Sequence, residues 1–415
     1  MTFSNSLTNI GSNAFRYCTS LTRLEIPNGV TEIQSLAFDG CSSLTYIYLP
    51  SSVTTIGSYA FDDCNKSTIY TNAHTASSGW DSNWKGSQPI YYDFVSLDAT
   101  DDFNYVTQSY MGESYVTITG LTATGLNKKN LVIPDQIEVI SDIRLRNNLF
   151  RGLEIVSIDL GSGVKKIPTE CFYECSKLET VVLHDGVTSI GQSAFGKCSK
   201  LTTINMPNSL TTIGREAFDY CTSLREIVIP ISVSTIEAYA FDVTGKLAIL
   251  VEASTNQPNW KQYWSGTSSN NKQIIYDYVS SGVINDFRYA KTSNGVTDAI
   301  HILGLVEGST NTNLVVPNAI EGISNIKIAD YAFDGNTIVK TIDLGTSVTY
   351  IGSYAFRGNS SLRSVIIPLN CAVIKANAFQ NCSTECVLNC EASEKPDTWE
   401  TNWNTSCQVV WGYNR

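Results

Sequence analysis

The sequence predicts an α/β-type solenoid, mostly β and irregular coil, in which short parallel strands stack as repeated coils of chain. Three observations predict this fold class: a repeat of 23 residues, an apolar pattern within each repeat, and two related segments that interrupt the repeats. The dipeptide Ala-Phe sets the register, and its phenylalanines form three phased runs: Phe15, Phe38 and Phe61; Phe172, Phe195, Phe218 and Phe241; Phe333, Phe356 and Phe379. A fixed period of this length is typical of stacked architectures.

Each repeat follows the pattern L-x-x-I-x-I-P-x-x-V-x-x-I-G-x-x-A-F-x-x-C, as in LTRLEIPNGVTEIQSLAFDGCSS from Leu21. The alternating apolar residues predict a short strand with one buried face, and proline ends it because proline has no N–H to donate. We expect the next apolar pair, such as Val30 and Ile33, to turn the chain. We expect Ala-Phe to close the coil. The 23-residue unit matches the length of leucine-rich repeats, about 20–29 residues.

Two tryptophans, four residues apart, stand in each interrupting segment and again near the end of the chain. These pairs are Trp80 and Trp84, Trp260 and Trp264, and Trp399 and Trp403. A spacing of four predicts that both rings lie on one face of a helical turn. We expect the pairs to cap each stack, because an uncapped solenoid exposes its core and a strand edge. A ligand-binding aromatic pair is the alternative.

Alternating aromatic and β-branched residues follow each interruption, in DDFNYVTQSYMGESYVTITGL from Asp101 and NDFRYAKTSNGVTDAIHILGL from Asn285. This pattern predicts a β-hairpin that starts the next stack. The chain is therefore expected to form three modules, 1–95, 96–279 and 280–415, each ending in a cap. The first lacks a hairpin and begins inside a repeat, so we expect it to be N-terminally truncated, with any export signal or anchor outside this sequence.

Charge and composition narrow the classes of partner. The chain has 28 Lys and Arg against 39 Asp and Glu, a formal net charge of -11, and no basic cluster. Nucleic acid is therefore not an expected partner, because phosphate binding needs concentrated Lys and Arg. No stretch approaches the roughly 20 apolar residues that cross a bilayer, so no membrane insertion is expected in this segment. The low charged content of 16% favours an extracellular or cell-surface protein.

Seven of the twelve cysteines lie three residues after a repeat phenylalanine: Cys18, Cys41, Cys64, Cys175, Cys198, Cys221 and Cys382. This position corresponds to the Asn/Cys position of leucine-rich repeats. We expect buried, reduced thiols that act as small apolar fillers, rather than metal or redox groups. Of the remaining five, four lie off this position near the end of the chain: Cys371, Cys386, Cys390 and Cys407. A disulfide between Cys386 and Cys407 is possible there, and free thiols are the alternative.

The residue types that carry chemistry do not form a recognisable set. His74, His184 and His301 are isolated, whereas zinc binding or histidine catalysis needs partners at defined spacing. No nucleophile elbow, P-loop or dinucleotide fingerprint occurs. We interpret the acidic cluster of Asp98 and residues 101–102 as a solvated turn, with a calcium site as the alternative. No catalytic residue, metal or cofactor is therefore predicted.

Together the repeat unit, the V-x-I-x-G-L to V-I-P lead-in and the W-x-x-x-W to W-G-Y terminator resemble the BspA-like leucine-rich-repeat proteins. The resemblance covers nearly the whole chain. It implies a surface or secreted protein of the kind that bacteria and some parasitic protists produce. It also implies adhesion to host proteins or to other cells. Members of that family usually carry an export signal and an anchor, and this sequence shows neither.

In a stacked solenoid the strand residues that alternate with buried ones point outward and form a surface across the coils. Among these outward positions, Arg23, Glu25, Tyr46 and Tyr48 are the predicted binding residues, because Tyr and Arg are over-represented in binding hot spots. The alternative is that they only cover the sheet. The same positions in later repeats hold Ser157 and Asp159, Thr180 and Val182, Thr203 and Asn205, Glu226 and Val228, Thr341 and Asp343, and Ser364 and Ile366.

These observations favour a non-enzymatic, monomeric surface or secreted repeat protein. Its expected role is adhesion or protein binding, with a host or neighbouring-cell protein or glycan held on the sheet face. One alternative is a structural spacer for a domain outside this sequence. A second is a hydrolase with an unrecognised pocket between modules.

Overall fold

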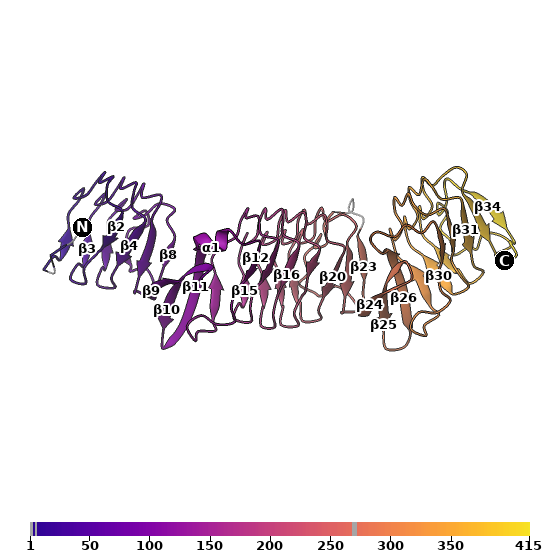
Figure 1. Cartoon of the computed structure of the whole chain (residues 1–415), viewed down its shortest axis with the longest axis horizontal. Helices are drawn as coiled ribbons and strands as arrows, with labels where there is room; N and C mark the ends of the chain where they lie inside the picture. Colours follow the sequence, from indigo (N-terminus) through magenta and orange to yellow (C-terminus); the bar gives the residue numbers. More distant parts are fainter. Residues whose placement is uncertain (1–2, 5, 268–271) are drawn as a thin grey trace. The chain divides into compact units, whose positions relative to one another are not determined.

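A computed structural model describes residues 3–4, 6–267 and 272–415 of the chain. The chain divides into two compact units: unit 1 is Met1–Lys128 with Pro134–Leu149, and unit 2 is Lys129–Ile133 with Phe150–Arg415. Both consist of stacked coils joined by short parallel strands (Figure 1), which confirms the predicted solenoid. In the described chain the α component is limited to one helix, α1 (Ala123–Leu126). The division into modules 1–95, 96–279 and 280–415 stays a prediction.

Two parallel sheets run along the coils of unit 1. The first contains β2 (Arg23–Glu25), β4 (Tyr46–Leu49), β6 (Thr68–Thr71) and β8 (Ile90–Tyr91), and the second β1 (Asn9–Ile10), β3 (Glu32–Ile33), β5 (Thr55–Ile56) and β7 (Gly79–Trp80). Besides the turn expected at Val30 and Ile33, Ile33 belongs to a strand. Its strand pairs with Ile10 of the preceding coil and Ile56 of the following one. Stacking at one repeat per coil places these short segments side by side, so their backbone groups pair.

Unit 2 repeats this arrangement. One set of sheets contains β12 (Asn130–Val132), β14 (Ser157–Asp159), β16 (Thr180–Val182) and β18 (Thr203–Ile204); β20 (Glu226–Ile229), β22 (Ala248–Val251) and β23 (Gln273–Ile275); and β27 (Asn313–Val315), β29 (Thr341–Asp343), β31 (Ser364–Ile367), β33 (Val387–Cys390) and β34 (Gln408–Trp411). A further sheet, of two-residue strands like those of the second sheet in unit 1, contains β15 (Lys166–Ile167), β17 (Ser189–Ile190), β19 (Thr212–Ile213) and β21 (Thr235–Ile236). Alternate strand residues are buried, as the repeat pattern predicts.

Both predicted hairpins are present. In unit 1, β9 (Phe94–Ala99), β10 (Phe103–Tyr110) and β11 (Glu113–Leu121) are antiparallel, and β11 pairs in parallel with β13 (Ile143–Leu145). In unit 2, the hairpin strands β24 (Tyr278–Ile284), β25 (Phe287–Ser293) and β26 (Asp298–Leu305) are also antiparallel. Its last strand, β26, pairs in parallel with β28 (Ile326–Ile328), and the same sheet continues with β30 (Val348–Ile351) and β32 (Val373–Ile374). The second hairpin therefore starts a stack directly, because its last strand offers the edge on which the first coil pairs.

Stacked phenylalanine rings form the centre of each core. In unit 1 the ring centroids of Phe38 lie 5.1 Å from those of Phe15 and 5.2 Å from those of Phe61, with nearly parallel planes. The longest run in unit 2 reaches Phe241 at spacings between 4.9 and 5.3 Å. It begins at Phe150, which a search for Ala-Phe misses because leucine precedes it. Offset stacking at this distance is favourable for aromatic rings.

The tryptophan pairs end these stacks, which confirms the capping prediction, but they do not lie on a helical turn. Trp80 belongs to β7, and Trp84 follows a turn. The ring of Trp84 meets Phe61 edge-on with centroids 5.9 Å apart, and the indole N–H of Trp80 donates to the Val53 carbonyl at 3.0 Å. The pairs in unit 2 repeat both contacts. All six rings are at least nine-tenths buried, so they are not available to a ligand.

The cysteines at the repeat position are buried, as predicted, except Cys18, which is exposed at the first coil. They are more than apolar fillers, because their thiols donate to carbonyls of the preceding coil. The Sγ atom of Cys198, for example, lies 3.1 Å from the Phe172 oxygen. Asn359 occupies the same position and donates to the carbonyls of Phe333 and Phe356 at 2.7 Å each.

All twelve cysteines are free thiols, so the structure lacks the disulfide considered between Cys386 and Cys407. The two side chains are nevertheless neighbours. Hydrogen bonds to Cys382 and Cys386, together with burial, raise the pKa of the Cys407 thiol. The local packing therefore favours the protonated thiol of Cys407.

Candidate functional site

An aromatic row crosses the first sheet of unit 1. We define it as Arg23 of β2, Tyr46 of β4, Tyr70 of β6 and Tyr91 of β8. The parallel register places Arg23 opposite Tyr46 and Tyr70 opposite Tyr91. Tyr70 lies opposite Tyr48, so Tyr46 is its diagonal neighbour. Adjacent strands of a sheet lie close enough for such side chains to touch, so four successive coils contribute to one row of side chains.

The members of the aromatic row stack on one another. The guanidinium carbon of Arg23 lies 3.6 Å from the ring centroid of Tyr46, a cation–π distance. The centroids of Tyr46 and Tyr70 are 4.9 Å apart, and those of Tyr70 and Tyr91 are 5.7 Å apart. Both faces of the Tyr46 ring are therefore covered, which leaves its edge and hydroxyl to meet a partner.

The four residues predicted from the sequence all lie on this outward face. Arg23 and Glu25 are exposed and form an ion pair at 2.6 Å, whereas Tyr46 and Tyr48 are partly exposed. Their placement confirms that they face outward, and their role in binding stays a prediction.

Three further aromatic residues at this surface are not evident from the repeat pattern: Tyr70, Tyr91 and Phe94. The ring of Phe94, at the start of β9, packs against Tyr70 at 5.0 Å and Tyr48 at 5.8 Å, and Tyr70 is only 6% exposed. These residues lie in the cap segment, where the repeat pattern has degenerated. Aligning S-T-I-Y-T from Ser67 with T-Y-I-Y-L from Thr45, one residue short of the usual period, would have placed Tyr70 at the outward position of Tyr48.

Burial keeps the tyrosines of this surface protonated. It raises the pKa of Tyr46 and Tyr48, and it raises the pKa of Tyr70 to about 12. At neutral pH each hydroxyl therefore remains a hydrogen-bond donor as well as an acceptor.

The equivalent face of unit 2 on β12 to β18 has a different chemistry. Its outward residues include Asn130, Ser157, Thr180 and Thr203. The Ser157 hydroxyl donates to the Asn130 side-chain oxygen at 2.7 Å. These side chains are small and offer no large anchor, so the stronger candidate site is the aromatic row.

The three histidines lie in separate environments. His74 stacks on Tyr110 with ring centroids 3.5 Å apart and lies 3.0 Å from Asp93. His184 is paired with Asp159 at 2.7 Å, and burial beside Lys327 lowers the pKa of His301 to about 4. Residues 3–4, 6–267 and 272–415 contain no group of three or more histidine, cysteine or acidic side chains that could hold a metal ion.

In the acidic cluster near the first hairpin, the carboxylate of Asp102 pairs with Lys128 at 2.7 Å. Its two predicted companions are Asp98, in β9, and Asp101, in the turn after it. The ion pair gives Asp102 a structural partner.

Among the described residues, no helix is long and apolar enough to span a bilayer.

Comparison with known proteins places these features in a family. The sequence profile of the BspA type leucine rich repeat region matches six copies, over residues 1–79, 124–257 and 311–395. The two interruptions between the matched segments contain the hairpins described above. Among curated proteins, none matches the chain.

Several solved structures are similar in fold. A leucine rich repeat protein of T. pallidum is 30% identical over 37% of this chain and 71% of that one, with a TM-score of 0.34. A leucine-rich repeat protein from Bacteroides ovatus is 20% identical over 98% and 80%, with a TM-score of 0.35. A leucine rich cell surface protein from Faecalibacterium prausnitzii is 19% identical over 76% and 95%, with a TM-score of 0.31.

Proposed function

Because the chain belongs to the family of BspA-type leucine-rich repeat proteins, we propose that it is a non-enzymatic surface or secreted protein that binds a partner protein through the aromatic row. The observation that carries this proposal is the continuous stack of Arg23, Tyr46, Tyr70 and Tyr91 on four adjacent strands. Tyrosine and arginine are the residue types that most often dominate protein interfaces.

A protein partner fits the aromatic row better than a glycan does. Sugars bind aromatic side chains mainly over the ring face, where the π-electron density lies. In the aromatic row the guanidinium of Arg23 covers one face of Tyr46 and the ring of Tyr70 covers the other. Tyr46 and Tyr48 are partly exposed and carry protonated hydroxyls, which suit backbone carbonyls and amides of another protein.

The surroundings of the aromatic row also suit a protein interface. Phe94 packs against Tyr70 and Tyr48 and holds their rings in place, so little side-chain freedom remains to be lost on binding. The exposed ion pair of Arg23 and Glu25 supplies a polar rim at one end. An ordered aromatic centre with a polar rim is the usual anatomy of a binding surface.

The test is binding of the purified chain to immobilised extracellular-matrix proteins and, separately, to glycans. The double variant Tyr46→Ala, Tyr48→Ala should weaken binding to a matrix protein by at least about 30-fold, because hot-spot side chains each contribute about 2 kcal/mol or more. The matched control is Thr180→Ala, Thr203→Ala, which alters the equivalent face of unit 2 and should leave the affinity unchanged.

Three outcomes would overturn the proposal. Binding to glycans alone would show that the ligand class is wrong. Unchanged protein affinity in the tyrosine variant would remove the aromatic row as the site. Absence of binding to every probe would favour the structural-spacer alternative.

A further inference from the structure

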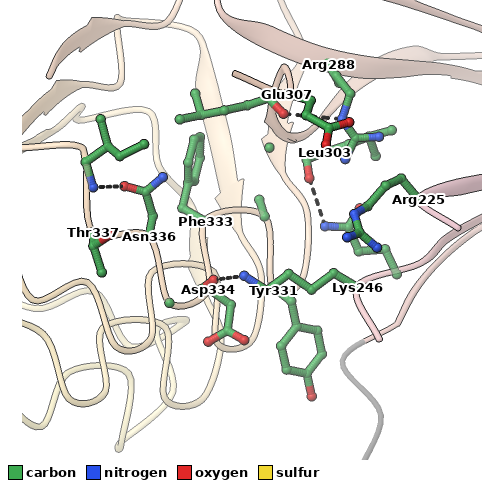
Figure 2. A pocket seen from close by; sticks show the side chains of 16 residues that line it. Arg225, Lys246, Arg288, Leu303, Glu307, Tyr331, Phe333, Asp334, Asn336 and Thr337 are labelled. Carbon is green, nitrogen blue, oxygen red and sulfur yellow. Dashed lines mark hydrogen bonds between the residues drawn. The ribbon is translucent and has the colours of Figure 1, made fainter. Parts of the chain in front are cut away.

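Unit 2 contains a pocket of about 420 Å³, shown in Figure 2. Arg225, Lys246 and Gln273 line one side of it, from the segments around β20, β22 and β23. The other side is formed by the hairpin of β25 and β26, with Arg288, and by the coil that contains Phe333. We call this the cationic pocket. Its volume lies within the range of about 300–1,000 Å³ that is usual for small-molecule sites.

Three positive side chains meet at the cationic pocket: Arg225, Lys246 and Arg288 (Figure 2). Arg225 donates to the carbonyls of Thr222 and Leu224, and Lys246 donates to the carbonyl of Asp334. Within the described part of the chain, no carboxylate lies in ion-pair distance of Arg225 or Lys246. These two cations therefore keep charge that a ligand can neutralise.

The negative groups near the cationic pocket are largely engaged. Both carboxylate oxygens of Asp334 accept hydrogen bonds from Arg357 at 2.8 Å. Glu226 lies 3.6 Å from Arg288, and Glu307 is exposed at the lining. In a chain with a formal net charge of -11, this local excess of positive charge favours an anion.

Gln273 adds a second requirement for a ligand. Its side chain is 7% exposed, and its Nε2 atom donates to the Leu303 carbonyl at 3.1 Å. Its Oε1 atom is buried and accepts no hydrogen bond from the described residues. A buried acceptor without a donor is energetically unfavourable. A ligand hydroxyl or N–H that reaches this oxygen would remove that cost.

Packing behind the cationic pocket holds its walls together. The small apolar cluster there contains Ala248, Leu250, Ile275, Ala290, Leu303 and Ala329. It joins β22 and β23 to the hairpin, so the two sides of the pocket are parts of one packed layer. A preformed site of this kind loses little conformational entropy on binding.

We propose that the cationic pocket binds an anionic sugar, with a carboxylate or sulfate group held by Arg225, Lys246 and Arg288 and a hydroxyl donating to Gln273 Oε1. An anionic sugar meets both requirements, because it carries a negative group close to several hydroxyl donors. A free amino acid fits less well, since its ammonium would face three cations. This site is independent of the aromatic row and of its protein partner.

The test is calorimetric titration of the whole chain at low salt with D-glucuronate, glucose 6-sulfate, glucose, inorganic sulfate and N-acetylglycine. We expect at least one of the two anionic sugars to bind saturably. Glucose and sulfate should each bind at least about tenfold more weakly, because each lacks one of the two contacts, and a charge-assisted hydrogen bond contributes about 1.5–3 kcal/mol.

The variant Arg225→Gln should weaken binding of that sugar by about tenfold. Its matched control is Arg215→Gln, which alters an exposed arginine that is paired with Glu216 and does not line the pocket. The control should leave the affinity unchanged. Thermal melting of both variants establishes that they are folded, and Lys246→Gln repeats the test at a side chain whose contact is with a carbonyl alone.

Four results would overturn the proposal. Glucose binding as tightly as glucuronate would show that charge is not recognised. Inorganic sulfate binding as tightly as glucose 6-sulfate would remove the hydroxyl contact. N-acetylglycine binding more tightly than either sugar would identify an acidic peptide terminus as the ligand. Absence of heat for every anionic sugar would leave the pocket without this function.

Discussion

The sheet face of β2 to β8 in unit 1 and that of β12 to β18 in unit 2 share one backbone plan but differ in chemistry. The first carries the stacked side chains of the aromatic row, and the second carries small polar side chains such as Thr180 and Thr203. The residues that alternate with them are apolar and buried in both units, for example Ile47 and Ile158. Inward positions are thus constrained by packing, whereas outward positions are free to vary with function.

The interior offers a second comparison, at the residue after the repeat phenylalanine. In unit 1 this residue is Asp39, whose carboxylate pairs with Arg16 of the preceding coil at 2.8 Å. In unit 2 the same position holds Asp219, but the preceding coil has Gly196 there, and the following coil has Asp242. The Oδ1 atom of Asp219 is buried and accepts no hydrogen bond from the described residues.

The largest expected effect on stability concerns the buried cores, which are built alike in the two units. Phe195→Ala in unit 2 and Phe38→Ala in unit 1 should each lower the free energy of unfolding by about 3–5 kcal/mol, since both rings are fully buried in a stack. Urea denaturation followed by circular dichroism would measure this. A loss below about 1 kcal/mol at either site would contradict the claim that stacked phenylalanines stabilise the core of each unit.

A smaller loss is expected at the position of Asn359. Asn359→Ala should lower the free energy of unfolding by about 1–3 kcal/mol, because two buried carbonyls lose their donor. Asn359→Cys is the matched control. It should retain more stability, because a thiol donates at this position in other repeats. Equal losses in both variants would show that the thiol hydrogen bonds contribute nothing.

Substitutions at outward positions should change the free energy of unfolding still less. The change should be larger on the face of unit 1 than on that of unit 2. Tyr46→Ala should cost about 0.5–1.5 kcal/mol of stability, because it removes stacking with Arg23 and Tyr70. Thr180→Ala on the other face should change stability by less than about 0.5 kcal/mol. Equal effects at the two positions would mean that the aromatic row is no more ordered than the polar face.

Asp219 should make the stability of unit 2 depend on pH. Burial, followed by repulsion from Asp242 and Glu216, raises the pKa of Asp219 to about 6 from 3.8. The folded state therefore binds more protons than the unfolded state between these values. The stabilising contribution of the protonated carboxyl is complete below about pH 4 and lost above about pH 6.

Asp219→Asn should consequently raise the melting temperature at pH 7 and leave it nearly unchanged at pH 4. Asp39→Asn, the control in unit 1, should lower the melting temperature at pH 7, because it breaks the pair with Arg16. Differential scanning calorimetry at both pH values gives the comparison. A stabilisation by Asp219→Asn that is equally large at pH 4 would contradict the assignment to this carboxylate.

Treatment with a reductant is expected to leave the mass of the protein unchanged. The twelve cysteines are thiols in both units, so the intact mass should be the same with and without reductant. Alkylation under denaturing conditions should add twelve groups. A loss of two hydrogens in the unreduced protein would show that Cys386 and Cys407 can form a disulfide after all.

The sequence by itself determined the repeat, its period and its inward positions, because each is a local pattern imposed by stacking. Phe38 and Cys198 were placed correctly from spacing alone, whereas the spacing of Trp84 from Trp80 indicated its place in a cap but not its local backbone. Only the tertiary structure decided three features that the repeat spacing does not show. These are the second sheet, which contains Ile33; the packing of Tyr70, Tyr91 and Phe94 at the aromatic row; and the proximity of Arg225 to Arg288 at the cationic pocket. The physical reason is distance along the chain. Repeats encode contacts between neighbouring coils, whereas caps, hairpins and pockets join segments that follow no common period.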